Sequence, residues 1–487
     1  MIRAYAVPTV RAVEDAAMAH LPEGELMARA ARGLAKVVRA RLKANGGGQV
    51  VALIGAGNNG GDALYAVARL AKWGYACAAV IPATAAAHAG GLRACRKAGV
   101  LVVSGGSDDR EWVALVDEAD VVIDGIAGIG GRPGLRTEAA AWVSAIPDDA
   151  WVVAVDLPSG TDPEGRISSA RSVIADETVI FGALKPVHLL PAGQAACGQI
   201  TVIDIGLDFS AAQVSVERLT RDDVAGLWPV PTARDHKYTR GVVGVVAGTT
   251  AYPGAGVLAV LGALGVGPGM VRYTGPSEVQ ALVHQHAPEA VTTPGRVQAW
   301  ALGCGLDPGD SGAARTIGSI RSALATALPA VVDAGALALY EAGRAGVTIL
   351  TPHAGELATL LTRRGVSRTR DDVEADPVTA AQEAADLLDA HIVLKGAHTL
   401  IVAPSSFEEP VRVSTDAPAW LGTAGAGDAL AGIIGTLLAA GLGARDAASL
   451  GVLVHGVTAD RVSAGGPLRV LDLVHALPRT VAELLRP

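Results

Sequence analysis

The chain has 487 residues and a formal net charge of −8, with 50% hydrophobic, 18% charged and only 3% aromatic residues. Single hydrophobic cores stop growing at roughly 250–300 residues, so this length predicts two domains. Acidic and basic residues are mixed along the chain and form no basic stripe for a phosphate backbone, and few aromatic rings are present to stack on bases. The composition therefore disfavours a nucleic-acid-binding protein and favours two domains with buried sheets.

The four cysteines are widely separated and form no paired metal-binding spacing, which favours a reducing compartment and no structural zinc site. The N-terminal residues lack the basic and apolar regions of a signal peptide. The two most apolar stretches, residues 253–271 and 429–444, are interrupted by Pro and Gly or too short to span a bilayer. We therefore expect a cytoplasmic protein with no membrane partner.

Apolar runs of strand length alternate with Ala-rich segments of helix length in the first half of the chain. The runs lie at residues 50–54, 77–81, 100–103, 121–123, 152–155, 179–181 and 200–203. This alternation predicts an α/β domain with a mostly parallel sheet, which we assign to residues 1–213.

A mixed, Pro-containing segment follows, and we expect a linker over residues 214–233. A second α/β series then predicts a domain over residues 234–487, with strands at 242–247, 299–302, 330–332, 347–350, 392–394 and 400–402. Within it, the charged stretch 363–376 is typical of a solvated loop.

A glycine-rich segment, Gly55 to Asp62, directly follows the first strand and opens a helix. Glycines let a ligand approach the backbone, and the free N–H groups at a helix start attract anions. Asn58 and Asn59 depart from the GxGxxG pattern, which disfavours an ordinary dinucleotide-dependent dehydrogenase. The alternative interpretation is a tight turn capped by Asn and Asp side chains.

Polar groups also follow other strands of the first half: Asp124, the loop 128–134, and the segment Asp156-Leu157-Pro158-Ser159-Gly160. The carboxyl ends of parallel strands meet at one ligand crevice, so these groups should converge there. The side-chain oxygens of Asn59, Asp124 and Ser159 are of the type that hard cations prefer.

The first half resembles the NAD(P)HX epimerases, the N-terminal domains of bacterial NAD(P)H-hydrate repair enzymes, through residues 58–62, 124–134 and 156–160. The resemblance implies a Rossmann-like three-layer fold and potassium at Asn59, Asp124 and Ser159. It also implies that the hydrated nicotinamide nucleotide contacts Asn58, Asn59, Gly60, Gly61, Asp62, Gly128, Ile129, Gly130, Gly131, Arg132, Pro133, Gly134 and Asp156. We assign general acid/base work to Asp156, and the alternative is a buried carboxylate that caps a turn.

In the second half, the segment Gly425-Ala426-Gly427-Asp428 runs into an apolar helix. Backbone N–H groups of such a turn form an anion cradle for a transferred phosphoryl group, and Asp428 is placed to accept the proton of an attacking hydroxyl. Two further polar segments, 351–356 and 395–399, also follow strands. A purely structural turn would not require an acid at this position.

Residues 234–485 resemble the ribokinase-like superfamily and, within it, the ADP/ATP-dependent NAD(P)HX dehydratases. The resemblance implies that the adenine nucleotide, with magnesium, binds Lys395, Gly396, Ala397, His398, Thr399 and Gly427. It implies that the hydrated dinucleotide faces Ala255, Gly305, His353 and Asp428, with Asp428 as the base for phosphorylation. Segments 303–307, 333–335 and 425–428 depart from the family pattern, and His353 is otherwise interpretable as a surface or capping residue.

The leading hypothesis is a bifunctional enzyme that epimerises hydrated NADH or NADPH and then dehydrates the S form with ADP or ATP. One alternative is a small-molecule kinase fused to a ligand-binding domain. Another treats the first half as a nucleotide sensor without activity. We expect hydrated NAD(P)H and ADP or ATP as ligands, no nucleic acid, and assembly as a homo-oligomer.

Overall fold

The computed structural model describes residues 1–487 except 84, 107–110 and 487, and it divides into two compact units. One unit comprises Arg3–Val216, and the other comprises Met1–Ile2 with Glu217–Pro487. Each unit contains its own buried apolar core. Among the described residues, no helix combines the length and the apolarity that crossing a bilayer requires.

The first unit contains a seven-stranded parallel sheet in the order β4-β3-β2-β5-β6-β7-β8. Its strands are β2 (Gln49–Ile54), β3 (Ala76–Ile81), β4 (Leu101–Ser104), β5 (Val121–Gly125), β6 (Trp151–Val155), β7 (Glu177–Phe181) and β8 (Gln199–Ile203). The strand order reverses direction between β2 and β5. Open parallel sheets bind ligands at the carboxyl ends of the strands at such a reversal.

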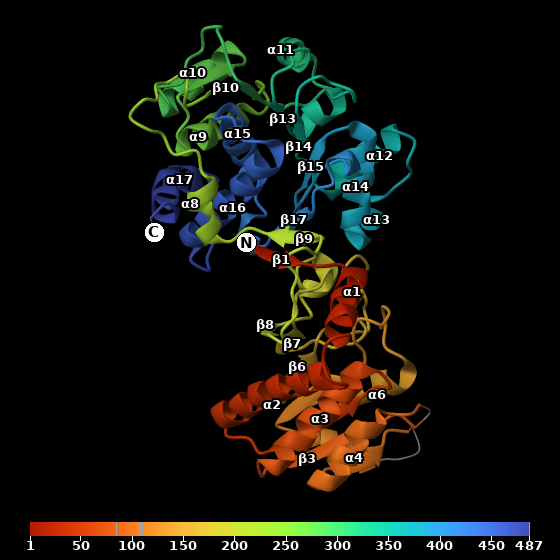
Figure 1. Ribbon diagram of the computed structural model, residues 1–487. Helices are drawn as coiled ribbons and strands as arrows, with labels where there is room; N and C mark the ends of the chain where they lie inside the picture. Colours follow the sequence, from red (N-terminus) through yellow and green to blue (C-terminus); the bar gives the residue numbers. More distant parts are fainter. Residues whose placement is uncertain (84, 107–110, 487) are drawn as a thin grey trace. The chain divides into compact units, whose positions relative to one another are not determined.

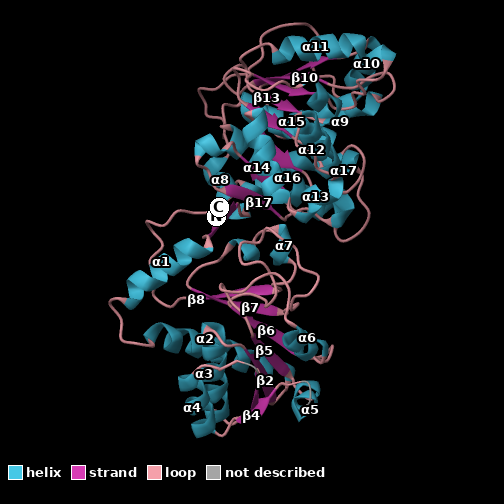
Figure 2. Ribbon diagram, turned by 90° about the vertical axis from the view of Figure 1, so that its right-hand side faces the viewer, coloured by secondary structure: helices cyan, strands magenta, loops and turns pink. Residues whose placement is uncertain are grey.

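Helices cover both faces of this sheet, and Figure 2 shows α2, α3 and α4 on one face with α5 and α6 on the other. The helices of the first unit are α1 (Val7–Met18), α2 (Glu25–Asn45), α3 (Asn58–Lys72), α4 (Ala89–Ala98), α5 (Glu111–Asp117), α6 (Thr137–Ser144) and α7 (Pro191–Gln194). Strands β5 and β7 are buried along their whole length, as covered parallel strands require. The α/β architecture predicted from the alternating pattern is confirmed.

A ten-stranded sheet, most of which belongs to the second unit, has the order β1-β9-β17-β16-β15-β14-β13-β12-β10-β11. Its strands are β1 (Ile2–Ala4), β9 (Val216–Arg218), β10 (Val242–Val246), β11 (Met270–Thr274), β12 (Ala299–Leu302), β13 (Ala330–Val332), β14 (Thr348–Leu350), β15 (His391–Leu394), β16 (Thr399–Val402) and β17 (Val411–Ser414). Strands β10 to β15 pair in parallel, whereas β15, β16 and β17 pair antiparallel. The order reverses between β10 and β12.

Figure 1 shows α15 and α16 on one side of strands β13 to β15, with α12 and α14 on the other. The helices of this unit are α8 (Val224–Leu227), α9 (Pro253–Gly265), α10 (Ser277–His286), α11 (Ala314–Leu324), α12 (Ala354–Arg363), α13 (Arg370–Ala375), α14 (Pro377–Leu388), α15 (Ala426–Ala439), α16 (Ala444–Ser463) and α17 (Val470–Leu484). The two apolar stretches of the sequence form α9 and α15, which pack in the core. A Cβ on Gly262 or Gly432 would overlap the backbone of the facing helix, so these glycines permit the close approach.

Two sequence expectations differ from the structure. Residues 214–233 are not a free linker, because β9 and α8 lie within them and Glu217 pairs with Arg412 and Arg445 at 3.2 and 2.5 Å. The stretch 363–376 is not a plain loop, because Thr369 and Asp372 form a capping box that starts α13. Reciprocal capping bonds satisfy free backbone N–H groups and stabilise even this short, charged helix.

Candidate active sites

A cavity of about 790 Å³ opens in the first unit at the reversal between β2 and β5. Predicted ligand-contacting residues line it: Asn58, Asn59, Gly128, Ile129, Gly130, Gly131, Arg132 and Gly134. Gly60, Gly61 and Asp62 follow within the first turns of α3, and Pro133 belongs to the same loop as its lining neighbours. The cavity therefore joins two motifs that are about seventy positions apart in the sequence.

Glycines are required where the two loops meet. A Cβ on Gly55 would overlap the Ile126 carbonyl group, and one on Gly60 would overlap the Gly55 carbonyl oxygen. A Cβ on Gly128 would overlap the Asn59 side chain. These contacts bring the end of β2, the start of α3 and the loop after β5 into direct packing, so the glycines are structural as well as permissive to a ligand.

The three residues expected to hold potassium come together. The Ser159 hydroxyl donates to Asp124 Oδ1 at 2.6 Å, and the Ser159 amide donates to Asp124 Oδ2 at 2.8 Å. The Asn59 amide nitrogen faces the carbonyl oxygens of Val155 at 2.5 Å and Ala127 at 3.3 Å. Burial raises the pKa of Asp124 to about 6, although the bonds from Ser159 oppose this shift. The cluster is thus a buried set of oxygen atoms around one amide group.

Asp156, which follows β6, forms a buried ion pair with Lys185. Lys185 Nζ lies 2.5 Å from Asp156 Oδ1, and the two side chains are 1% and 8% exposed. Asp156 has a φ of 67°, a left-handed conformation that costs a non-glycine residue of the order of 1–3 kcal/mol. His188 holds this backbone, because its Nδ1 accepts from the Lys185 amide at 2.9 Å and its Nε2 therefore donates to the Asp156 carbonyl at 2.8 Å.

A second carboxyl group, Asp62, lies near this pair on α3. Its Oδ1 is buried and lacks a hydrogen-bond partner among the described residues. Burial, reinforced by the negative charges of Asp156 and Glu14, raises the pKa of Asp62 well above its usual range. The site therefore places a buried carboxyl group, whose neutral form is favoured by its surroundings, near the Asp156 side chain that is paired with Lys185. Environments that separate two carboxyl groups in this way suit one to act as an acid and the other as a base.

Sequence reasoning missed Lys185, His188 and Glu14. Lys185 and His188 come after the end of β7, just as the predicted site residues come after the ends of other strands. This position was the signal from which they could have been predicted. Glu14 lies on α1 and lines the cavity, and no pattern in the sequence connected that helix with the sheet.

In the second unit, Asp428 occupies the first turn of α15, and Gly425 at its N-cap has a φ of 91°. Behind this turn, Lys395 Nζ lies 2.6 Å from Asp333 Oδ1, which also accepts from the Thr351 hydroxyl at 2.7 Å. A Cβ on Gly427 would lie 3.4 Å from Lys395 Nζ and 3.6 Å from Asp333 Oδ2. The turn therefore combines backbone N–H groups at a helix start with an adjacent ammonium group, which suits a phosphoryl anion.

The remaining predicted residues lie at neighbouring strand ends. Gly305, after β12, packs against Ala255 of α9, since a Cβ on Gly305 would overlap the Ala255 side chain. His353 forms a backbone bridge with Lys395, and its Nδ1 caps α12 by accepting from the amides of Gly355 and Glu356 at 3.1 and 3.2 Å. The capping role foreseen for His353 is thus present, and its side chain is 59% exposed. Gly396, Ala397, His398 and Thr399 form the turn that joins β15 to β16 and the start of β16.

Charge shapes this second site. Burial, together with the nearby charge of Asp333, raises the pKa of Asp428 to about 6. Burial acts to lower the pKa of Lys395, but Asp333 and Glu356 outweigh it and the pKa is raised. A carboxylate with a pKa near the operating pH is suited to accept a proton. Asp333, Thr351 and Cys304 were not predicted as site residues, although each follows or ends a strand.

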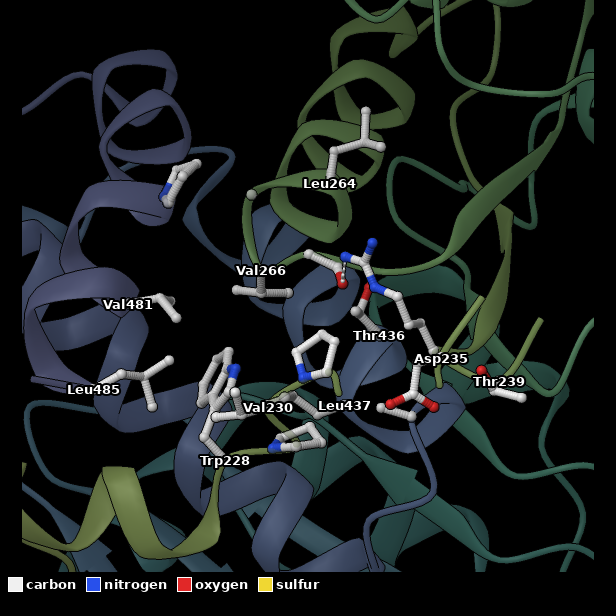
Figure 3. Close-up of a pocket in the computed structure, with 17 residues that line it drawn as sticks. Trp228, Val230, Asp235, Thr239, Leu264, Val266, Thr436, Leu437, Val481 and Leu485 are labelled. Atoms are coloured by element: carbon white, nitrogen blue, oxygen red, sulfur yellow. Dashed lines mark hydrogen bonds between the residues drawn. The ribbon is translucent and has the colours of Figure 1, made fainter. Parts of the chain in front are cut away.

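A separate cavity of about 410 Å³ in the second unit contains none of the predicted residues (Figure 3). Trp228, Val266, Leu437 and Val481 contribute to its mostly apolar wall, and Asp235 and Thr239 lie at its polar edge. Its walls come from the chain before β10, the end of α9, α15 and α17 rather than from the strand ends.

Two family models match the chain. Residues 23–187 match the model described as YjeF-related protein N-terminus, and residues 243–477 match the model described as NAD(P)H-hydrate dehydratase. The first match covers Asp156, Lys185 and the cavity apart from its α1 residues, and the second covers the Asp333, Lys395 and Asp428 cluster.

Curated relatives match either almost the whole chain or one of its two halves. A bifunctional NAD(P)H-hydrate repair enzyme of Mycobacterium tuberculosis is 42% identical over 461 residues, which cover 91% of each chain. The Mycobacterium leprae counterpart is 41% identical over 95% of this chain and 94% of its own. An NAD(P)H-hydrate epimerase of Clavibacter sepedonicus is 39% identical over 43% of this chain and 92% of its own. A solved Bacillus subtilis ADP/ATP-dependent NAD(P)H-hydrate dehydratase, co-crystallised with ATP and Mg²⁺, is 28% identical with a TM-score of 0.49 and covers 54% of this chain and 97% of that one.

Proposed function

The chain belongs to the family of bifunctional NAD(P)H-hydrate repair enzymes, and from that premise we propose which residues perform each of its two reactions. The first unit is an NAD(P)H-hydrate epimerase, which interconverts the R and S forms of hydrated NADH or NADPH. The second unit is an NAD(P)H-hydrate dehydratase, which returns the S form to NAD(P)H with ADP or ATP. The observation that carries the proposal is that each unit places a carboxyl group, Asp156 or Asp428, beside a lysine ammonium group.

For the epimerase we propose that Asp62 and Asp156 act as the acid and the base. Inversion requires the hydroxyl group to leave the hydrated ring carbon as water and a water molecule to return from the other face. The protonated Asp62 carboxyl group donates the proton to the leaving oxygen, while the ring nitrogen lone pair stabilises the carbon. Asp156 then accepts the proton of the incoming water. Transfer of that proton through solvent back to Asp62 restores both groups, and the ion pair with Lys185 holds Asp156 in place.

The test uses Asp156→Asn, which keeps the shape of the side chain. We incubate the variant with a mixture of the R and S hydrates and ADP or ATP, and we measure the increase in reduced-nicotinamide absorbance. We expect the S fraction to react at the normal rate and the R fraction to react only as fast as it epimerises without catalysis. Rapid consumption of the R fraction would exclude Asp156 from the reaction and also leave the sensor alternative without support.

For the dehydratase we propose phosphorylation followed by elimination. Asp428 takes the proton from the hydrate hydroxyl group as its oxygen attacks the terminal phosphoryl group of the nucleotide. The carbon–oxygen bond then breaks, phosphate leaves with the bonding electrons, and loss of the neighbouring carbon-bound proton restores the ring double bond. The turn at Gly427 and the Lys395 ammonium group face the phosphoryl charge, as charge stabilisation in phosphoryl transfer requires.

The fate of the phosphate tests this sequence. With labelled ATP, we expect inorganic phosphate and NADH to appear in equal amounts, and Asp428→Asn to abolish both while leaving epimerisation of the R hydrate intact. A stable phosphorylated product without NADH would instead favour the kinase alternative. Retained dehydration in Asp428→Asn would exclude Asp428 as the base.

The ligand sets follow from the same residues. We propose that the adenine nucleotide contacts Gly427 and the turn Lys395 to Thr399, and that magnesium arrives with the nucleotide rather than in a dedicated protein site. We propose that potassium binds at Asn59, Asp124 and Ser159. If the Asn59 side-chain amide is rotated so that its oxygen takes the place of its nitrogen, the atoms around this point are all oxygens, and one carboxylate supplies the negative charge. A cytoplasmic location and a homo-oligomer stay predictions.

A further inference from the structure

Three side chains that commonly bind metal ions meet in the second unit. Cys304 follows β12, Asp333 follows β13, and Asp428 lies on the first turn of α15. One ligand atom from each lies within 4.8 Å of the other two. Cys304 and Asp333 are almost fully buried, at 1% and 2% exposure, whereas Asp428 is partly exposed and gives the cluster its access to solvent.

The two oxygen atoms of Asp333 have different partners, and this difference points to a ligand. Oδ1 accepts from the Lys395 ammonium and the Thr351 hydroxyl. Among the described residues, Oδ2 has only the Cys304 thiol as a hydrogen-bond contact, at 3.9 Å. A thiol is a weak donor, so this buried carboxylate oxygen is left without a strong partner and is directed at the sulfur atom.

Charge adds an independent reason. As carboxylates, Asp333 and Asp428 bring two negative charges to the single positive charge of Lys395. A divalent cation that also converts the Cys304 thiol to a thiolate would bring this set of groups to neutrality. Buried charges are stable only when such a balance is reached.

We propose that Cys304, Asp333 and Asp428 form a binding site for a zinc-class divalent cation, whose fourth ligand is water on the exposed side of Asp428. Zinc takes mixed sulfur and oxygen ligands at about 2.3 and 2.0–2.2 Å in a tetrahedron, so its ligand atoms lie about 3.6 Å apart. The 3.9 Å between Cys304 Sγ and Asp333 Oδ2 is already close to that separation. Magnesium prefers six oxygen ligands and does not fit a thiolate site.

Binding forms a zinc–sulfur bond and releases the thiol proton to solvent, with no change in oxidation state. A bound cation would also occupy the Asp428 carboxylate. In a consequence that rests on the proposed role of Asp428 as a base, zinc therefore inhibits the dehydratase and leaves the epimerase of the same chain active.

Cadmium is the direct probe, because a cadmium thiolate gives an ultraviolet charge-transfer band. We titrate the full-length protein with Cd²⁺ in the absence of nucleotide and expect a band that saturates at one ion per chain. The band should disappear in Cys304→Ser and persist in Cys95→Ser, a matched control whose buried thiol lies in the core of the first unit and donates to the Leu64 carbonyl oxygen at 3.1 Å. A band of equal size in Cys304→Ser, or no band in the unmodified protein, overturns the site.

Inhibition is the second readout, measured with buffered free Zn²⁺ because nucleotides also bind zinc. We expect chelator-reversible loss of dehydratase activity, and a shift of at least about tenfold in the half-inhibiting concentration for Cys304→Ser and for Asp333→Asn. Equal zinc sensitivity of Cys304→Ser and the unmodified protein overturns the site. A Cys304-dependent cadmium band without inhibition supports the site and instead contradicts the role of Asp428 as a base.

Discussion

Lys185 and Asp156 form an ion pair inside the first unit, with Nζ 2.5 Å from Oδ1 and both side chains buried. They are 29 positions apart in sequence and follow neighbouring parallel strands, β7 and β6. Because the pair is removed from water, neither charge is well compensated without the other.

Replacing Lys185 by Met should therefore destabilise the first unit by about 3–5 kcal/mol, since a buried carboxylate is left without its partner. Hydrogen exchange of β6 and β7 measures the loss, and dehydration of the S hydrate by the second unit serves as the internal control. The double variant with Asp156→Asn should recover much of the stability but no epimerase activity. If Lys185→Met lowers the stability by the same amount in the unmodified protein and in Asp156→Asn, the ion pair does not determine the stability of the first unit.

His188 should make the stability of the first unit depend on pH. Burial, with a smaller effect of Lys185, lowers the pKa of His188 to about 4 from 6.5. Between these values the unfolded chain binds a proton that the folded chain does not, so the stability that His188 contributes is complete above about pH 6.5 and is lost as the pH falls toward 4. The full effect is about 3 kcal/mol.

His188→Gln should remove that pH dependence. Hydrogen exchange of β6 and β7 at a series of pH values is the appropriate measurement, because His391 and His455 also have lowered pKa values and lie in the second unit. An unchanged slope in the variant would show that His188 is not the titrating group.

Potassium should stabilise the first unit and support its activity. Exchanging K⁺ for choline should lower the epimerase rate and the melting temperature of the first unit, because a bound ion stabilises only the folded state. The dehydratase rate, measured on the S hydrate, should not change. Asp124→Asn should lose the potassium-dependent shift in melting temperature, and an equal shift in that variant would contradict the proposed ligand set.

Two glycines of the turn that opens α15, Gly425 and Gly427, should respond differently to substitution by Ala. At Gly427 a Cβ meets Lys395 Nζ at 3.4 Å and Asp333 Oδ2 at 3.6 Å, so the fold accepts it. The methyl group would nevertheless displace the phosphoryl group, and a shift of about 1 Å lowers a rate by about 10²-fold. At Gly425 the φ of 91° and a Cβ 2.5 Å from Leu258 Cδ1 make Ala costly to folding.

Melting temperature and dehydratase kinetics of the two variants separate these effects. We expect Gly427→Ala to have the melting temperature of the unmodified protein but a lower dehydratase rate. We expect Gly425→Ala to have a lower melting temperature. A Gly427→Ala variant with normal kinetics would place the phosphoryl group elsewhere.

Much of the architecture was predictable because strand and helix signals are local. Apolar runs such as 50–54 and 121–123 became β2 and β5, and the glycine-rich segments became the turns that open α3 and α15. The segment 214–233 was interpreted as a linker because the contacts that hold residues 216–218 come from distant parts of the sequence. Glu217 pairs with Arg412 and Arg445, about two hundred positions away.

The sequence by itself determined the two α/β units and their family, and it pointed to Asp156 and Asp428 as candidate site residues, since these properties lie in short contiguous motifs. Only the tertiary structure decided that Lys185 and His188 hold Asp156, that Asp62 is buried beside it, and that Lys395, Asp333 and Cys304 surround Asp428. The physical reason is that pairing and burial of charge depend on distances between the ends of different strands. Those distances are fixed by strand order, which no local pattern encodes.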